Sequence, residues 1–365
     1  MQGRVIVFAD LDYFFAQVEE NRNLSLKDKP VVVCVYSGRT EDSGAVSTAN
    51  YIARKHGVKS GMPIAMAKRK LQDSAGVFLP VDIPFYEEIS DEIMNTLRSF
   101  ADNFEQVGID EAYLDVSEKV NADFDEASRL ARQIKDQIKA RHKLTCSIGI
   151  GPNKLVAKIA VDLQKPDGLT MIKPEEVERV LFPLPVDRLI GVGTKTSKKM
   201  QAMGIATIGD LAKYDIQKLT GVFGQNLGSY FHKASLGVDD EPVQERGEAE
   251  SVSRISTLKE DSRSLDFIMA KTDQLCDEIV KDIVQLGVLF KTIGIVAILT
   301  DMSVHSRSKT IKTPTNDAQV LKDAVRELFE KFLKESEFEA RRVGVKVSSL
   351  VKMEYSQRRL MSFLE

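Results

Sequence analysis

Apolar residues follow two periods along the first half of the chain, one typical of strands and one of helices. A helical period begins at Tyr13, and a later one places Leu155, Val156, Ile159, Ala160 and Leu163 on one face. Strands and helices alternate as far as about residue 172, which indicates a sheet with helices on one face. β-Branched and alternating apolar runs predict the strands at 4–8, 31–36, 105–116 and 144–150, and a short helix is expected at 50–55.

Residues 173–237 have a different pattern, with short helical segments separated by glycines. Two stretches share one pattern, Ile190-Gly191-Val192-Gly193 and Leu219-Thr220-Gly221-Val222-Phe223-Gly224. A glycine hairpin between helices exposes backbone N–H groups at a helix N-terminus, where a phosphate can bind. The alternative is a pair of ordinary helix C-caps, against which the doubling and the nearby lysines count.

A polar segment, residues 240–249, precedes a third pattern. Its order is strand, helix, strand, strand, helix, strand, which is the split βαβ arrangement of a four-stranded sheet backed by two helices. The expected strands are 252–258, 290–299, 306–311 and 342–351, and the helices span 265–286 and 320–332.

The composition narrows the class of protein. A chain of 365 residues is too long for one core, so we expect at least two domains. The apolar runs are too short to span a membrane. Three widely spaced cysteines and an N-terminus without signal-peptide features favour a reducing, cytoplasmic location.

The net charge is only −3, but the basic residues are grouped. Lysines dominate residues 191–237. A second basic group lies along the last expected strand and consists of Arg341, Arg342, Lys346 and Lys352. Local basic patches suit phosphate binding at chosen places, although solvated surface is the plainer explanation for any single patch.

Three acidic residues are candidates for a metal site. Asp10 stands at a strand end, and Asp110-Glu111 follow Gly108. Joining nucleotides calls for two Mg²⁺ ions, which prefer carboxylate oxygens. Neighbours in a strand point to opposite faces, so Asp110 and Glu111 can share one site only if the chain turns at Gly108 or Ile109.

Four longer segments surround these residues: Phe8-Ala9-Asp10-Leu11-Asp12-Tyr13-Phe14-Phe15-Ala16-Gln17-Val18-Glu19, Thr48-Ala49-Asn50-Tyr51-Ile52-Ala53-Arg54, Ile109-Asp110-Glu111-Ala112-Tyr113-Leu114-Asp115, and Gly149-Ile150-Gly151-Pro152-Asn153-Lys154 with Ala157-Lys158-Ile159-Ala160. Together they resemble the Y-family DNA polymerases of the DinB-like, polymerase IV group. The similarity covers nearly the whole chain, in the right order and spacing, and the C-terminal motif described below has an archaeal or eukaryotic form.

The resemblance implies an α+β, multidomain right-hand polymerase. It implies a ferredoxin-like palm at 1–12 and 77–172, small fingers at 13–76 and a helix-hairpin-helix thumb at 173–239. A linker at 240–249, a split βαβ little finger at 250–347 and a tail at 348–365 would follow. The implied activity is low-fidelity, poorly processive translesion synthesis in DNA damage tolerance and repair.

The resemblance also implies roles for single residues. Asp10, Asp110 and Glu111 would be catalytic and, with the carbonyl of Leu11, would hold two Mg²⁺ ions per site, with Mn²⁺ as an alternative. Phe15 would be the steric gate that clashes with a ribonucleotide 2′-hydroxyl, at a position where many relatives carry tyrosine. Ala45 and Ser47 would cover the nascent base pair, unless they are simply packed in a turn. The nucleotide-binding positions would be Phe14, Phe15, Thr48, Tyr51, Arg54 and Lys165.

Its implied partners are primer-template DNA, deoxynucleoside triphosphates and the replication sliding clamp, and we expect a monomer. Residues 357–364 resemble a clamp-binding box, with Gln357, Leu360, Phe363 and Leu364 as contacts. Gly108 departs from the family, which usually has serine there; because it is not a ligand position, we expect an altered turn and retained activity. The DNA-binding positions would be Gly191, Gly193, Lys195, Lys198, Gly221, Gly224, Arg341, Arg342 and Lys346.

Two other functions remain open from the residues alone. A nucleotidyl cyclase also carries neighbouring carboxylates and two metals, but it needs neither the paired hairpins nor the second sheet. A DNA-binding accessory protein with an inactive site would use only the C-terminal half, and the presence of all three acidic residues argues against it.

Overall fold

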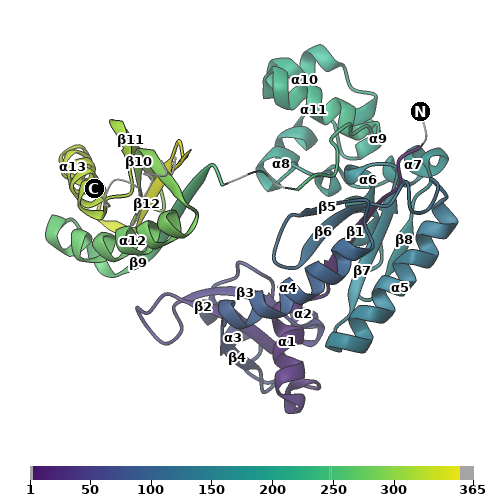
Figure 1. Cartoon of the computed structure of the whole chain (residues 1–365), viewed down its shortest axis with the longest axis horizontal. Helices are drawn as coiled ribbons and strands as arrows, with labels where there is room; N and C mark the ends of the chain where they lie inside the picture. Colours follow the sequence, from purple (N-terminus) through teal and green to yellow (C-terminus); the bar gives the residue numbers. More distant parts are fainter. Residues whose placement is uncertain (1–2, 246, 248, 354–365) are drawn as a thin grey trace, which may run out of the picture. The chain divides into compact units, whose positions relative to one another are not determined.

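The computed structural model describes residues 3–245, 247 and 249–353 (Figure 1). The chain divides into two compact units, of which the second contains residues 35–45, 63–65 and the described residues from 247 onward. Each unit is described by itself. In the part of the chain that the structure describes, every helix is too short or too polar to cross a lipid bilayer.

The palm is a five-stranded sheet in the order β5-β6-β1-β7-β8. In chain order its first four strands and two helices read β1-α4-β5-β6-α5-β7, and β1 lies between β6 and β7. This is the ferredoxin-like arrangement, which confirms the expected palm fold. Its elements are β1 (Ile6–Leu11), α4 (Ile83–Ser99), β5 (Asn103–Gln106), β6 (Glu111–Asp115), α5 (Phe124–His142), β7 (Cys146–Gly151), α6 (Lys154–Leu163) and β8 (Leu169–Met171).

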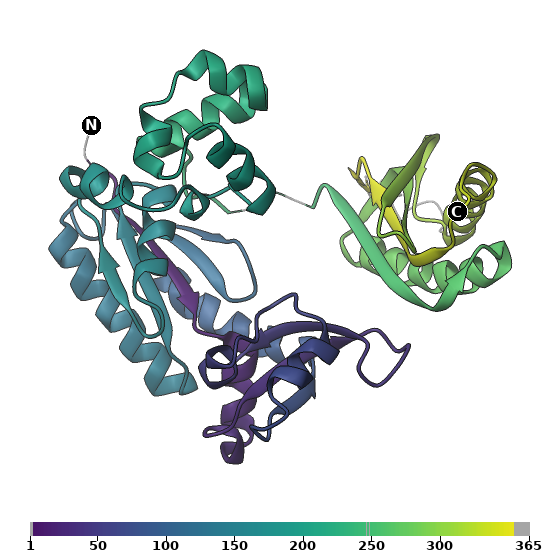
Figure 2. The same ribbon diagram turned by 180° about the vertical axis from the view of Figure 1, so that it is seen from behind.

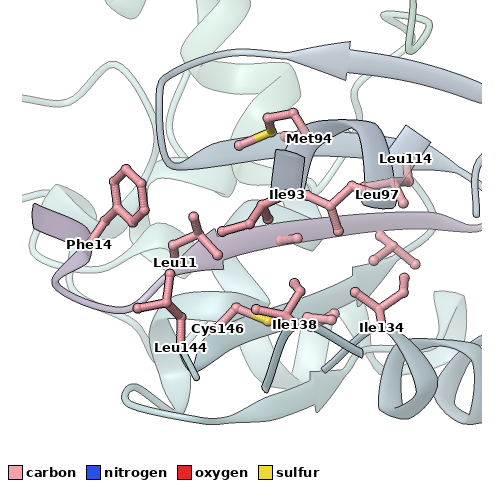
Figure 3. Packing of buried hydrophobic residues seen from close by; sticks show 14 of the residues in the cluster. Leu11, Phe14, Ile93, Met94, Leu97, Leu114, Ile134, Ile138, Leu144 and Cys146 are labelled. Carbon is pink, nitrogen blue, oxygen red and sulfur yellow. The ribbon is translucent and has the colours of Figure 1, made fainter. Parts of the chain in front are cut away.

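Helices cover both faces of this sheet, so the expectation of helices on one face alone is wrong. On one face, side chains of α4 and α5 pack with Leu11 of β1 and with Cys146 (Figure 3). On the other face, Ile6 and Phe8 pack with Ala157 and Val161 of α6. Successive side chains of β1 point to opposite faces of the sheet, and helices cover both faces. The apolar run at the start of β1 is therefore buried on both sides.

Glycines on β7 allow α6 to lie directly against the sheet. A Cβ atom on Gly149 would clash with the carbonyl oxygen of Ala157 and the backbone nitrogen of Val161. The helix begins after Asn153, whose side chain accepts a hydrogen bond from the N–H of Val156 at 2.9 Å. This close packing fixes α6, which carries Lys158 and leads to Lys165.

The fingers contain a small three-stranded sheet in the order β3-β2-β4. Its strand β4 was expected in the palm, which the sequence placed from residue 77 onward, but it pairs with β2 and not with the palm sheet. The predicted strand at 31–36 is confirmed as β2, and the first helix begins at Phe14, one residue later than expected. Tyr13 is the N-cap residue of that helix. The elements are α1 (Phe14–Arg22), η1 (Leu24–Leu26), β2 (Val31–Tyr36), β3 (Gly44–Ala49), α2 (Tyr51–Lys55), α3 (Ile64–Lys70) and β4 (Val77–Pro80).

The thumb consists of short helices, as its sequence predicts, around a core that includes Met200, Leu211 and Phe231. After it, Val243 is only 4% exposed and packs with Ile6, Phe8 and Tyr113 of the palm. The first part of the polar segment therefore lies on the palm. The thumb elements are η2 (Pro174–Glu176), α7 (Val177–Leu181), η3 (Val186–Arg188), α8 (Thr194–Ala202), α9 (Ile208–Ala212), α10 (Ile216–Phe223) and α11 (Gln225–Ser235).

The little finger has the predicted β-α-β-β-α-β order, with the sheet order β11-β10-β12-β9. All neighbouring pairs are antiparallel, so β9 and β10 are parallel with β12 between them, which is a split βαβ unit. Both helices contribute to one core beside the sheet (Figure 2). The elements are β9 (Ser251–Ser262), α12 (Leu265–Gln285), β10 (Val288–Leu299), β11 (Val304–Thr315), α13 (Ala318–Glu335), β12 (Ala340–Ser348) and β13 (Val351–Lys352).

We expect Gly149→Ala to destabilise the protein by about 1–3 kcal/mol or more, because the added methyl group must displace the backbone of α6. Urea denaturation followed by circular dichroism measures the change. Gly221→Ala is the matched control, since a Cβ there meets no atom within 4 Å and helical alanine is favoured over glycine. Equal stabilities of Gly149→Ala and the wild type would contradict the proposed packing.

Candidate active site

A cavity of about 240 Å³ lies where β1 of the palm leads into the first helix of the fingers. It joins residues that are far apart in the sequence, from Asp10 to Lys165. Most of the residues predicted to bind metal or nucleotide line it. The lining residues are Asp10, Leu11, Asp12, Tyr13, Phe14, Phe15, Ser47, Thr48, Tyr51, Arg54, Ser60, Asp110 and Lys165.

Strand pairing brings the three acidic residues to one end of the sheet. Asp10 on β1 is the register partner of Glu111 on β6. The N–H of Leu11 donates to the carbonyl oxygen of Asp110 at 2.9 Å. β6 begins only at Glu111, so Asp110 lies in the preceding turn and is free of the strand alternation, as the shared-site hypothesis required.

The turn before Glu111 is held from two sides. The hydroxyl of Ser90 on α4 donates to the carbonyl oxygen of Ile109 at 2.5 Å, and the side-chain amide of Gln106 donates to that of Gly108 at 3.0 Å. A Cβ atom on Gly108 would lie 3.1 Å from Cγ of Glu111 and 3.3 Å from Oδ1 of Asp110. Glycine at this position thus leaves the two carboxylates room to move.

Two lysines neutralise part of this acidic cluster. Nζ of Lys165 lies 2.5 Å from Oδ2 of Asp10, and Nζ of Lys158 lies 3.1 and 3.0 Å from the two carboxylate oxygens of Glu111. Burial raises the pKa of Asp10 to about 6, although the Lys165 ammonium opposes the shift. Burial and the Glu111 charge also raise the pKa of Asp110.

The three carboxylates do not yet form a ligand set. Within residues 3–245, 247 and 249–353, no three acidic, histidine or cysteine side chains converge as they would around a metal ion. Asp10 and Asp110 line the cavity, whereas Glu111 pairs with Lys158 beside it. The donors nevertheless fit a hard divalent cation, because they are carboxylate oxygens whose mutual repulsion such an ion would relieve.

The N-terminus of α1 and the helix α2 form the opposite wall. Tyr13 adopts the left-handed conformation, with φ of 37°, where the chain turns from β1 into α1. The free N–H groups and the dipole of a helix N-terminus favour an anion there. From α2, the guanidinium of Arg54 lies 4.9 Å from the centre of the Tyr51 ring and donates to the carbonyl oxygen of Ala49 at 2.8 Å.

A chain of buried polar side chains connects α1 with α2. Asn50 caps α2 by accepting from the N–H of Ala53 at 2.9 Å, and its amide donates to Glu20 of α1 at 2.7 Å. The Tyr13 hydroxyl also donates to Glu20, at 3.2 Å. The positions of Tyr51 and Arg54 are therefore tied to α1.

The Phe15 ring is held in place by a second aromatic ring. It stacks on Tyr86 of α4, with the centroids 4.4 Å apart and the planes at 20°. Tyr86 is fully buried, and its hydroxyl donates to Glu19 at 2.8 Å. Sequence reasoning missed Tyr86, because nothing in the local pattern of α4 distinguishes it from other core positions.

The structure separates the two residues expected to cover the nascent base pair. Both lie on β3, but only Ser47 lines the cavity. Ala45 forms an isolated bridge with Pro63. Asp12, Tyr13 and Ser60 also line the cavity without having been predicted; for Asp12 a signal existed, since it is the second carboxylate of Asp10-Leu11-Asp12.

The expected DNA-binding residues of the thumb are exposed at two turns. Gly191, with φ of 85°, and Gly193 precede α8, on which Lys195 and Lys198 are exposed. Gly224, with φ of 82°, joins α10 to α11. Gly221 lies inside α10, so the prediction that it forms part of the hairpin is wrong; the true turn needs the positive φ that Gly224 supplies.

On the little finger, Arg342 and Lys346 lie on the sheet face opposite the helices, because Val343, Val345 and Val347 alternate with them into the core. Nε of Arg342 is buried and has no hydrogen-bond partner among the described residues. Arg341 instead pairs with Asp261 at 2.9 Å, and this pairing lowers the pKa of Asp261 to about 2.

Comparison with known proteins agrees with this arrangement. The impB/mucB/samB family matches residues 9–162, its C-terminal domain matches 249–360, and the thumb domain of DNA polymerase iota matches 187–239. DNA polymerase IV of Nitrosopumilus maritimus is 45% identical over 96% of both chains. The chain belongs to the Y-family DNA polymerases of the DinB-like, polymerase IV group.

Other relatives of the polymerase give the same result. DNA polymerase IV of Methanosarcina acetivorans is 44% identical over 96% of this chain and 97% of its own. A solved Y-family DNA polymerase chimera of Dbh and Dpo4 is 36% identical, with a TM-score of 0.90 over 96% of this chain and 100% of its own. The polymerase is a DNA-directed DNA polymerase with the predicted multidomain α+β fold.

We expect Asp10 to titrate near pH 6 in the metal-free polymerase, since burial disfavours its charged form. Below that pH a divalent cation must compete with a proton for Asp10, so apparent cation affinity falls as the pH falls. Carbon-13 NMR of labelled aspartates, assigned with Asp10→Asn, measures the midpoint. Lys165→Met should raise it further, and Mg²⁺ should lower it; an ordinary carboxyl midpoint in the wild type would contradict the burial argument.

Proposed function

We propose that Asp10, Asp110 and Glu111, with the carbonyl oxygen of Leu11, hold two Mg²⁺ ions against a deoxynucleoside triphosphate in this translesion polymerase. Mn²⁺ is the alternative ion. The proposal is carried by one observation: a single cavity contains Asp10, Asp110, an open helix N-terminus and two basic side chains. When bound, the ions would activate the primer 3′-hydroxyl and neutralise the phosphates.

The protein's own groups bind and orient the nucleotide. Thr48, Tyr51 and Arg54 supply donors and positive charge for the triphosphate, and α1 adds its N-terminal N–H groups. Lys165 exchanges its contact with Asp10 for the phosphates, where its charge binds the incoming triphosphate and also stabilises the leaving pyrophosphate. Lys158, which pairs with Glu111, would likewise have to release this carboxylate for it to serve as a cation ligand.

Phe15 excludes ribonucleotides by its bulk. The ring cannot retreat from a 2′-hydroxyl, because Tyr86 stacks behind it and is itself fixed by Glu19. Phe14 closes the adjoining part of the cavity. Ser47, which lines the cavity, is small, so the cover over the new base pair tolerates distorted bases; Ala45 would contribute only from beyond the cavity lining.

The thumb and little finger contact primer-template DNA through its phosphates and independently of base identity. A ternary insertion complex is known for Dbh DNA polymerase, which is 36% identical. Gly191, Gly193, Lys195, Lys198 and Gly224 offer N–H groups and charge, and Arg342 and Lys346 offer positive charge on the open face of the little-finger sheet. Gly221 can contribute only from the surface of α10, and Arg341 must first exchange Asp261 for a phosphate.

The tail would bind the replication sliding clamp. Gln357, Leu360, Phe363 and Leu364 lie outside the described residues, so the support comes from the sequence pattern alone. We further propose a monomer that acts in the cytoplasm.

Asp110→Ala should reduce the rate of primer extension by about 10³-fold or more. It removes a carboxylate that we propose holds the Mg²⁺ ions, which would stabilise the negative charge of the transition state. Binding to primer-template DNA, measured by fluorescence anisotropy, should change by only a few-fold. Asp136→Ala, an exposed substitution on α5, is the control and should extend primers at the wild-type rate. Retained extension by Asp110→Ala would rule out the proposed metal site.

Phe15→Ala should reduce discrimination against ribonucleotides by about 100-fold, which corresponds to about 2.7 kcal/mol of differential transition-state binding. Single-nucleotide insertion with matched dNTP and rNTP gives the ratio of kcat/KM values. Phe15→Tyr keeps the ring and should retain the discrimination. An unchanged ratio in Phe15→Ala would refute the steric gate.

A further inference from the structure

Asp12 is a buried carboxylate that the proposed chemistry does not use. Its side chain is 1% exposed, and both of its oxygens accept hydrogen bonds from the palm. Oδ1 accepts from the hydroxyl of Ser147 at 2.7 Å, and Oδ2 accepts from the hydroxyl of Thr145 at 2.8 Å. Because its oxygens are occupied in this way, Asp12 is not a spare metal ligand.

The third hydrogen bond to Asp12 leads back to the active site. The backbone N–H of Asp167 donates to Oδ2 of Asp12 at 2.8 Å, and Asp167 lies only two residues after Lys165. Both residues belong to the loop of residues 164–168, which joins α6 to β8. Asp167 has a φ of 53°, in the left-handed region that residues other than glycine disfavour, so contacts outside the loop must hold it there.

A second tether reaches the same loop from α5. Nζ of Lys135 lies 2.7 Å from Oδ1 of Asp167 and 3.2 Å from the carbonyl oxygen of Gly168. The same ammonium contacts the carbonyl oxygen of Cys146 on β7 at 2.5 Å. Asp12 and Lys135 therefore fasten the loop to two different elements of the palm.

We propose that Asp12 is a positioning residue for Lys165. By fixing the N–H of Asp167, it sets the path of the loop and places the Lys165 ammonium in the cavity beside Asp10. Lys135 acts in the same way from the other side. This inference rests on the proposed role of Lys165 in binding the triphosphate.

If Asp12 had a purely structural role, its substitution would lower the stability of the protein without a particular effect on one step of the reaction. A positioning role has a narrower effect, because a displaced Lys165 weakens contact with the triphosphate in particular. The KM for the incoming dNTP should then rise more than kcat falls. The effect should also disappear once Lys165 itself is absent, since nothing is left to position.

The experiment measures single-nucleotide insertion and thermal unfolding for Asp12→Asn, Lys165→Ala and the double variant, using the full chain with primer-template DNA and Mg²⁺. Asparagine keeps the size of the side chain, but it turns one acceptor into a donor. We expect Asp12→Asn to raise the KM for dNTP by about tenfold, the scale of a small misplacement, with kcat changed less. The double variant should have the KM of Lys165→Ala.

Glu105→Gln is the matched control. Glu105 is also a buried palm carboxylate, but it accepts hydrogen bonds from Lys154, at 2.8 and 3.0 Å, and from the N–H of Gln244, at 3.4 Å, which lie outside the loop that carries Lys165. This variant should lose thermal stability and keep the wild-type KM. Should Asp12→Asn fail to fold, Ser147→Ala and Lys135→Met each remove one part of the network, and each should raise the KM in the wild-type background only.

The outcomes separate the two claims. If Lys165→Ala raises the KM but the loop variants leave it unchanged, the positioning role is wrong and the role of Lys165 stands. Effects on the KM that multiply in the double variant would also overturn it. If Lys165→Ala itself leaves the KM unchanged, the triphosphate role of Lys165 fails, and the positioning role fails with it.

Discussion

The structure depends on holding like charges together at the end of one sheet. The pairing of β1 with β6 places Asp10 opposite Glu111, and the turn before β6 adds Asp110. Such a group is costly in a half-buried site, and the raised pKa values of Asp10 and Asp110 record that cost. Lys165 and Lys158 offset it through direct ion pairs.

The rest of the palm is arranged around this cluster. α6 brings Lys158 to Glu111 and leads to Lys165, and it can do so because Gly149 lets it approach the sheet. The fingers add α1 and α2, which a buried chain through Glu20 and Asn50 keeps in fixed relation. Asp10, Phe15, Arg54, Asp110 and Lys165, for which we propose roles in metal binding, nucleotide binding and sugar selection, thus line one cavity although they are far apart in the sequence.

Much of this could be predicted from the sequence. The buried strand β1 has an unbroken apolar run from Ile6 to Ala9, and Asp10 near its end stands out because charge is rare in a buried strand. The resemblance then supplied roles for Phe15, Arg54 and Lys165, which the cavity brings together. The order of elements in the little finger was also correct, because its two amphipathic helices have strong periodicity.

What failed depended on tertiary contacts. Packing of α6 on the second sheet face follows from Gly149 and Gly151, whose meaning appears only once a helix lies over them. Gly221 shares a motif with Gly224, but only Gly224 takes the positive φ of the turn. Tyr86 and Asp12 act through partners 67 or more residues away, beyond the reach of any local pattern.

The ion pairs of Asp10 with Lys165 and of Glu111 with Lys158 affect the folding stability of the palm. Because lysines already serve as counter-ions for Asp10 and Glu111, the palm does not rely on bound cations for its folding energy, in contrast to a structural zinc domain. Chelating agents should therefore stop catalysis and leave the fold intact.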